Sequence, residues 1–353
     1  MIADIERQAG SLFVVGFPGR DVPTPLASAI TDGRVGGVIL FSRNFDDVAG
    51  CRALCERVRA LSPEALIAVD QEGGRVQRLR APFPELPPMR RFGERGDPEL
   101  ARRAGDLIGR ALKAVGVHQN YAPVLDVDSN PANPVIGDRA FGREPAAVAR
   151  FGRAFIDGIQ ARNVAACGKH FPGHGDTERD SHVDRPWVRA DADVLRTREL
   201  VPFAELARTD LAAIMSAHVV YPAFDPDEPA TFSARVLQGL LRQQLGFEGA
   251  IVSDDLEMGA VERTIPEAAV AAVAAGCDQL LVCSRPEAAE AARSALVEAV
   301  GAGHLPAARL ADASRRAEQL RRRWVGPPAE VDWAALGAER DALVAELEGP
   351  GVV

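Results

Sequence analysis

The feature that most constrains the fold is a regular alternation of short apolar, strand-like runs with longer helix-like stretches. The strand-like runs span residues 12–16, 37–41, 66–70, 118–126, 164–169, 212–217, 250–254 and 279–283. The helix-like stretches span residues 24–32, 46–61, 98–115, 145–161, 192–208, 234–245, 265–275 and 286–301. Eight strands that are each followed by a helix predict an α/β fold of the (β/α)8, TIM-barrel type. A doubly wound open sheet is the alternative, because strand counts taken from a sequence are imprecise.

The chain shows no internal repeat and one break near its end. Gly326-Pro-Pro328 follows an arginine-rich helix end, and residues 329–348 then have the pattern of a short amphipathic helix. We therefore predict one barrel domain over residues 1–325 and a helical tail over residues 326–353.

Composition excludes several classes of protein. Apolar residues make up 47% and charged residues 26% of the chain, as is ordinary for a soluble globular protein. A net charge of −9 argues against nucleic acid or an anionic membrane as a partner. The first residues lack the order of a signal peptide, and the five cysteines are scattered. We expect a cytoplasmic, reduced and monomeric protein.

Polar clusters follow five consecutive predicted strands. They are Asp70-Gln-Glu-Gly-Gly-Arg75, Asn120-Tyr-Ala-Pro-Val-Leu-Asp126, Lys169-His170, Ser216-Ala-His218 and Ser253-Asp-Asp255. Enzymes with the barrel fold place their active sites at the carboxyl ends of the strands. The clusters therefore predict a catalytic site at that face.

The cluster after the fifth strand is the densest in reactive residues. Three of the six histidines fall within residues 169–182. The spacing of His170 and His174 occurs in zinc enzymes, but there it lies on a helix, and the prolines and glycines between these residues oppose one. Asp180 and His182 are better read as an acid/base pair, since a carboxylate can fix the tautomer of an imidazole.

Other polar residues allow two readings each. Asp254 and Asp255 could supply a nucleophile or a metal ligand, or they could cap a helix. Lys169 and the arginines Arg75, Arg78 and Arg139 could hydrogen-bond a polar substrate, whereas the arginines could also form surface ion pairs.

These motifs together resemble those of the family 3 glycoside hydrolases. The matching segments are 69–78, 122–126, 135–139, 168–175, 180–182 and 253–256, in the order of the family, within residues 10 to 300. The resemblance is narrower still to the NagZ-type β-N-acetylglucosaminidases of peptidoglycan recycling.

The resemblance implies a role for each residue. Asp254 would be the nucleophile of a retaining reaction, with Asp180 and His182 as the acid/base dyad on a mobile loop. The terminal sugar would be bound by Asp70, Arg78, Arg139, Lys169 and His170. No cofactor or metal is implied, and the partner would be an N-acetylglucosamine-containing glycan or muropeptide.

Chain length favours the hexosaminidase branch, since β-glucosidases of the family are typically longer and use a glutamate from a second domain. A β-glucosidase and a phosphorylase, in which phosphate replaces water, stay as alternatives. A non-catalytic sugar-binding barrel is another. So is a metal-dependent barrel hydrolase, with His170, His174, His218 and Asp254 as ligands.

Overall fold

Eight parallel strands close into a barrel in the computed structural model, which describes residues 2–178 and 185–349. The strands are β1 (Phe13–Val15), β2 (Gly37–Leu40), β3 (Leu66–Val69), β6 (Gln119–Asn120), β7 (Ala165–Phe171), β8 (Ala213–Ser216), β11 (Ala250–Asp255) and β12 (Gln279–Val282). β1 pairs with β12 on one side, Phe13 opposite Leu280, and with β2 on the other, Val14 opposite Gly37. The sheet therefore has no open edge, so the predicted barrel is confirmed and the doubly wound sheet is wrong.

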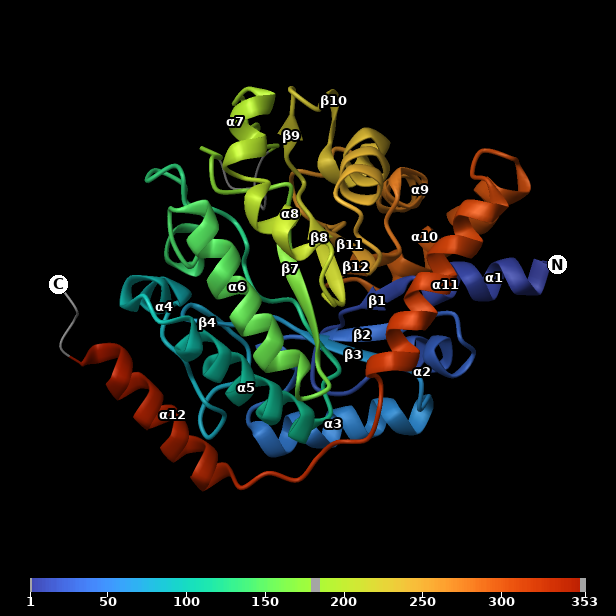
Figure 1. Cartoon of the computed structure of the whole chain (residues 1–353). Helices are drawn as coiled ribbons and strands as arrows, with labels where there is room; N and C mark the ends of the chain where they lie inside the picture. The colour runs from blue at the N-terminus through green and yellow to red at the C-terminus, as the bar shows by residue number, and fades with distance from the viewer. Residues whose placement is uncertain (1, 179–184, 350–353) are drawn as a thin grey trace.

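Helices surround the barrel (Figure 1). Those in the first half are α1 (Ile2–Ser11), α2 (Thr24–Thr31), α3 (Val48–Leu61), α4 (Met89–Arg95), α5 (Pro98–Val115) and α6 (Pro145–Gln160). Those in the second half are α7 (Ala192–Thr197), α8 (Val201–Leu206), a π-type helix (Arg235–Gln244), α9 (Ile265–Ala275), α10 (Pro286–Gly301), α11 (Ala307–Trp324) and α12 (Trp333–Glu348). Several have a proline in the first turn, where no backbone N–H is needed.

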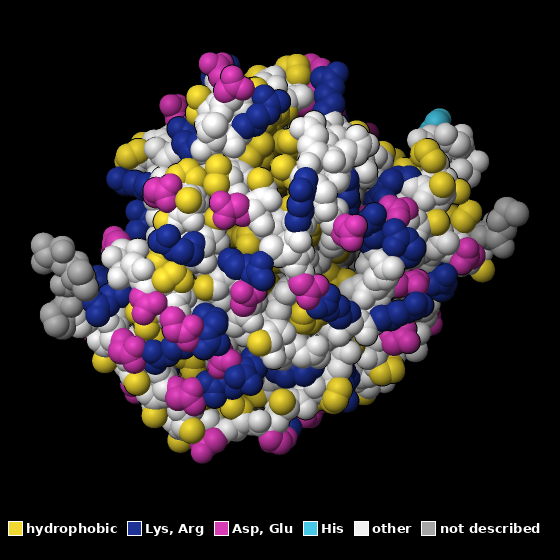
Figure 2. Space-filling model, in the orientation of Figure 1, with side chains coloured by type: hydrophobic (Ala, Val, Ile, Leu, Met, Phe, Trp, Pro, Cys, Tyr) yellow, Lys and Arg dark blue, Asp and Glu magenta, His cyan; other side chains and the backbone are white. Residues whose placement is uncertain are grey.

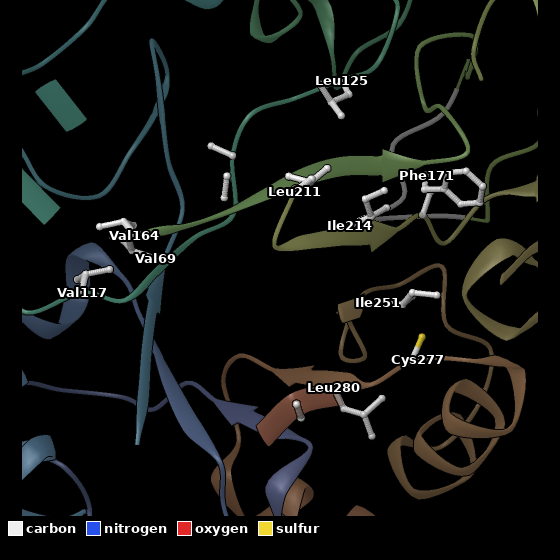
Figure 3. Close-up of a cluster of buried hydrophobic side chains, with 14 of the residues drawn as sticks. Val69, Val117, Leu125, Val164, Phe171, Leu211, Ile214, Ile251, Cys277 and Leu280 are labelled. Carbon is white, nitrogen blue, oxygen red and sulfur yellow. The ribbon is translucent and has the colours of Figure 1, made fainter. Parts of the chain in front are cut away.

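The barrel strands bury both faces, in two layers. Outward side chains pack under the helices, and Figure 3 shows Val69, Phe171, Ile214, Ile251 and Leu280 from five of the strands. The inward side chains form a separate cluster, which includes Val14, Leu66, Ala68, Ala165, Cys167, Val252 and Leu281. Successive strand residues point to opposite faces, so the near-continuous apolar runs follow from burial on both sides.

Two expected elements differ from the sequence pattern. The run 118–126 forms strand pairing only at Gln119–Asn120 and a single bridge between Val124 and Lys169, because Pro123 has no N–H to donate. The expected helix over 192–208 is divided into α7 and α8. Arg198, with φ −126° and ψ −78°, breaks the helical path, and the second helix begins at Val201 with Pro202 in its first turn.

Short elements decorate the carboxyl side of the strands. β4 (Gln71–Gly73) and β5 (Val76–Gln77) form a hairpin directly after β3. β9 (Val220–Tyr221) and β10 (Asp225–Pro229) form another after β8, seen near α7 at the top of Figure 1. These hairpins build up the rim over the barrel opening.

The C-terminal helix α12 packs against α5, fixed by Leu336, Leu343 and Leu347. Arg103 pairs with Glu346 at 2.6 Å at one end of this contact. Side chains of both charges are interspersed over the face shown in Figure 2. Within the described residues, no helix is long and apolar enough to cross a membrane.

Candidate active site

Three predicted site residues occupy the next inward position beyond the buried layer. Asp70, Lys169 and Asp254 each stand two residues after an inward-facing side chain, namely Ala68, Cys167 and Val252. The two-residue period of a strand therefore carries them to the inside of the carboxyl end. This is the face where the sequence predicts the active site.

A buried charge cluster joins β3, β7 and the loop before α6. Lys169 Nζ lies 2.8 Å from Asp70 Oδ1 and 2.6 Å from Glu72 Oε1. Arg139 donates to both oxygens of Glu72, at 2.8 and 2.9 Å, in a forked pair. Arg78 Nη2 donates to Asp70 Oδ2 at 3.4 Å. Four of the five predicted sugar-binding residues are thus brought together, around a glutamate that the sequence reading did not single out.

Glu72 keeps this cluster ionised. Burial alone would raise the pKa of the Glu72 carboxyl, but Arg139 and Lys169 outweigh it and lower that pKa. Burial alone would lower the pKa of Lys169, but Asp70 and Glu72 raise it. Asp70 is the more exposed of the two carboxylates, with 15% of its side chain accessible against 2% for Glu72. Asp70 is therefore placed to accept a ligand, and Glu72 to hold the cations.

Asp126 positions the start of the histidine loop. Its Oδ1 accepts from the backbone N–H groups of His170 and His174, at 3.1 and 2.7 Å. Its Oδ2 lies 2.7 Å from His170 Nδ1. This contact fixes the His170 ring through one nitrogen and leaves Nε2 as the one that can meet a substrate.

The loop after β7 is held tightly as far as Thr177. Asn133 Nδ2 donates to the carbonyls of His174 and Gly175 and to Thr177 Oγ1, at 2.8, 3.0 and 3.1 Å. A Cβ at Gly175 would lie 1.6 Å from the carbonyl oxygen of Val127, so only glycine fits this approach. The predicted dyad Asp180 and His182 follows in residues 179–184, outside the described part of the chain.

Asp254, near the carboxyl end of β11, faces Lys169 of the buried charge cluster. Burial by itself would raise the pKa of Asp254, but His170, His218, the Asp255 backbone N–H and Lys169 together lower it. Its Oδ1 accepts from that N–H at 2.8 Å. Asp254 is therefore an anionic carboxylate beside a cluster of side chains that can hydrogen-bond a polar substrate.

Asp255 has the opposite environment. Burial raises the pKa of its carboxyl to about 6, with Glu257 and Asp254 adding to the rise. Its Oδ1 accepts from the N–H groups of Glu257 and Cys283, at 3.1 and 3.2 Å. A turn follows it and α9 begins only at Ile265, with Thr264 as its cap, so helix capping by these aspartates is wrong.

His170 and His174, two of the ligands expected for a metal-dependent hydrolase, lie close together but do not point at a common centre. The rings of His170 and His174 are 5.8 Å apart between centroids and meet edge to face. His174 Nδ1 lies 2.9 Å from Thr177 Oγ1, and burial lowers the pKa of His174 to about 4. Over residues 2–178 and 185–349, no group of three or more potential ligands could hold a metal ion.

Two important residues of the site, Glu72 and Asp126, were not predicted as site residues from the sequence. A third residue, Arg75, was considered as a substrate-binding residue, but it contacts the loops of the rim instead. Glu72 and Asp126 stand inside motifs that already looked unusual, but their partners are distant in the chain. Arg75 donates to the carbonyl of Ile136 and pairs with Asp138 at 3.2 Å, with 48% of its side chain exposed. It therefore braces two rim loops.

Comparisons with known proteins identify a consistent set of relatives. A model described as the N-terminal domain of glycosyl hydrolase family 3 matches residues 5–320. A β-hexosaminidase of Thiobacillus denitrificans is 50% identical over 270 residues, which are 74% of this chain and 75% of that protein.

Solved structures agree with these relatives. A family 3 β-N-acetylglucosaminidase from a Paenibacillus species superposes with a TM-score of 0.91 at 37% identity, over 97% of this chain and 68% of that one. NagZ from Neisseria gonorrhoeae, in complex with N-trifluoroacetyl-D-glucosamine, gives a TM-score of 0.74 at 36% identity, over 87% and 97% of the two chains.

Proposed function

This chain belongs to glycosyl hydrolase family 3, and from that premise we propose that it is a retaining exo-β-N-acetylglucosaminidase. It removes terminal β-linked N-acetylglucosamine from a glycan, as a β-N-acetylhexosaminidase. The finding about NagZ supports the choice of sugar, since that relative binds an N-acylated glucosamine.

The observation that best supports the mechanism is that Asp254 is buried and yet has a lowered pKa. Its pKa is lowered despite burial, and His170 and Lys169 are among the groups that lower it. A carboxylate that stays ionised can attack the anomeric carbon and form a covalent glycosyl-enzyme. Asp70, Arg78, Arg139, Lys169 and His170 would hold the sugar hydroxyl and acetamido groups during this step.

The acid/base role falls to His182, with Asp180 to orient it and stabilise its protonated form. His182 would protonate the leaving oxygen in the first step and take a proton from water in the second. An unperturbed histidine, with a pKa of about 6.5, suits both directions near neutral pH.

The natural aglycone and the setting belong to the same proposal. We infer that the substrate is a peptidoglycan-derived muropeptide and that the enzyme acts as a monomer in the cytoplasm during cell-wall recycling. The five described cysteines are free and buried, which suits a reducing compartment.

The decisive experiment traps the intermediate. His182→Ala, mixed with p-nitrophenyl N-acetyl-β-glucosaminide, keeps a good leaving group but loses the base for the second step. We expect a burst of p-nitrophenol and an intact protein heavier by one N-acetylglucosaminyl unit, attached at Asp254 in peptide mass spectrometry. An adduct at another residue, or steady turnover without an adduct, would refute the assignment.

The matched control is a pair of neighbouring substitutions. Asp254→Asn removes the nucleophile and should abolish turnover, whereas Asp255→Asn keeps the acceptor for Glu257 and Cys283 and should retain most of it. Activity that EDTA removes would favour the metal-dependent hydrolase. Preference for the aryl glucoside would favour a β-glucosidase, and glycosyl phosphate formed in phosphate buffer would favour a phosphorylase.

A further inference from the structure

A pocket of about 380 Å³ lies at the amino ends of the barrel strands. Its lining includes Ser11, Gly36 and Ala65, which stand just before β1, β2 and β3. The candidate active site lies at the carboxyl ends of these parallel strands, where Asp70 follows β3. The pocket is therefore separate from that site, and its volume is within the usual range for a small-molecule site.

The last turns of α11 form one wall of this pocket. Leu320 and Trp324 of this helix belong to the inward-facing cluster of the barrel, so the helix covers the amino end of the barrel. Arg321 lies between these two residues in the chain and lines the pocket. Its Nη1 donates to the carbonyl oxygen of Ser11 at 2.7 Å. This hydrogen bond holds the guanidinium against the chain that enters β1.

Gly36 leaves the space that the Arg321 guanidinium occupies. A Cβ at this position would lie 2.8 Å from Arg321 Nη1 and 2.3 Å from the carbonyl oxygen of Ser11. Both separations are too short for non-bonded atoms, so a side chain here would displace the guanidinium or the backbone. The glycine therefore lets the arginine reach the ends of the strands.

Arg321 lacks a carboxylate partner in the pocket. Among the residues that the structure describes, it forms no ion pair. Glu318 pairs instead with Arg7 at 2.7 Å and with Arg322 at 3.5 Å. Burial lowers the pKa of Arg321, and the carboxylates of Glu318 and Glu64 do not restore it. A partly buried cation without a partner is costly, so an anion that reaches it gains a charge-assisted hydrogen bond.

The charges and walls of the pocket suit an anion with one negative charge and an apolar body. Glu64 is exposed at the pocket, forms no ion pair with the described residues, and acts on Arg321 only at a distance. It would repel a second negative charge, such as that of a phosphate dianion. Apolar wall is supplied by Ile30, Val35 and Val325. The ligand chemistry that fits is a carboxylate on a small apolar group.

We propose that this pocket binds a small organic carboxylate. The carboxylate accepts a forked pair of hydrogen bonds from Arg321, and the apolar body packs on Ile30, Val35 and Val325. A guanidinium offers its N–H groups in a planar fork that matches a carboxylate. Only its Nη1 has an acceptor among the described residues, so donors remain for the ligand. The pocket is thus a second ligand site, and it does not depend on the proposed glycosidase function.

Benzoate is the probe, because it joins one carboxylate to an apolar ring. Isothermal titration calorimetry on the full-length protein compares it with benzamide, which is neutral, and with phenyl phosphate, which carries a second charge. The variants are Arg321→Gln, Arg321→Lys and Glu64→Gln. Arg315→Gln is the matched control, since Arg315 is an exposed arginine of α11 that pairs with Asp312 outside the pocket.

We expect benzoate to bind wild type at least about tenfold more tightly than benzamide, as the gain of a charge-assisted hydrogen bond implies. Arg321→Gln should weaken benzoate about tenfold, and Arg321→Lys, which keeps the charge without the fork, should weaken it less. Glu64→Gln should tighten phenyl phosphate about threefold and benzoate by a smaller factor. Arg315→Gln should bind all three compounds as wild type does.

A wild-type crystal soaked with 4-bromobenzoate locates the ligand independently of any variant. An anomalous bromine peak against Ile30 and Val35 is the expected result, and a peak found only beside Lys169 at the carboxyl ends of the strands would overturn the proposal. Equal binding of benzoate and benzamide, or unchanged benzoate binding in Arg321→Gln, would overturn it as well. If Arg321→Gln does not fold, unchanged phenyl phosphate binding in Glu64→Gln refutes the charge argument.

Discussion

At the scale of single residues, Glu72 lies at the centre of the sugar-binding cluster. Its side chain is too buried to be the carboxylate that best contacts the sugar. Its carboxylate forms ion pairs with both Lys169 and Arg139, the two buried cations of the cluster. Asp70 then remains as the carboxylate that can leave Lys169 for a substrate hydroxyl. The same logic explains Asp126, which holds His170 without occupying both ring nitrogens.

Glu72→Gln should therefore reduce stability and activity together. Removing one partner of a buried ion pair typically costs about 3–5 kcal/mol. We expect a loss of this size in urea unfolding and a fall of at least about 100-fold in kcat/KM for the aryl glycoside. Glu339→Gln, which breaks the exposed pair with Arg110, should change the unfolding free energy by less than about 1 kcal/mol.

The Glu72 effect should also depend on pH. The folded-state pKa of Glu72 is lowered, so its contribution is present above the unfolded pKa of about 4.3 and is lost as the pH falls. The difference in unfolding free energy between wild type and Glu72→Gln should shrink on acidification below about pH 4.5. A constant difference down to pH 3 would contradict the charge assignment.

Asp255→Asn should show the opposite sign. The folded-state pKa of Asp255 is raised to about 6, so the folded protein binds the proton more strongly than the unfolded chain between pH 4 and 6. Wild-type stability therefore falls as the pH rises through this range, and the asparagine variant lacks that fall. The stability of the variant relative to wild type should increase by about 1–3 kcal/mol from pH 4 to 7, measured by urea unfolding.

At the scale of elements, the loop after β7 is a rigid support for the residues that follow it. Asn133 and Asp126 bind its backbone, and Gly175 packs against Val127 with no room for a side chain. Precision in this loop matters because a shift of about 1 Å in a catalytic group can cost 100-fold in rate.

Gly175→Ala should move the loop and the dyad with it. We expect kcat on the aryl glycoside to fall at least about tenfold, with a loss of stability of about 1–3 kcal/mol from overpacking. Gly142→Ala is the matched control, since its Cβ would meet nothing closer than 3.9 Å and the Gly142 carbonyl accepts from Asp128 in the same region. An active Gly175→Ala would mean that the position of the dyad is set elsewhere.

At the scale of the whole molecule, α12 adds a layer outside the barrel. Its connecting segment is tied to the amino-terminal side, where Ala329 N–H donates to the carbonyl of Lys113 and His118 Nε2 lies 3.2 Å from the carbonyl of Gly326. The Trp333 ring packs near Phe83, with centroids 6.2 Å apart. The division into a barrel over 1–325 and a tail over 326–353 stays a prediction.

Truncation after Val325 tests that division. Three buried leucines are lost from the contact with α5, each worth about 1.5–3 kcal/mol, so the melting temperature should drop by at least about 5 °C. Turnover of the aryl glycoside at 20 °C should be kept, because none of the proposed site residues belongs to residues 326–353. Loss of turnover in a truncated chain with native circular dichroism would give the tail a functional role.

Local patterns in the sequence determined the class of fold and the place of the site. Strand and helix periods are set by the backbone, so eight alternations predict a barrel, and residues such as Asp70, Lys169 and Asp254 fall at strand ends by counting. The expected helix over 192–208 went wrong where Pro202 and Arg198 broke a pattern that periodicity alone could not divide.

Only the tertiary structure decided which charges share a partner. The pair of Glu72 with Lys169 spans 97 residues, and Asp126 reaches His170 across 44. Burial makes each of these groups costly without a partner, and the partner is brought by closure of the barrel. A sequence pattern records which side chain a position carries, whereas packing decides what that side chain meets.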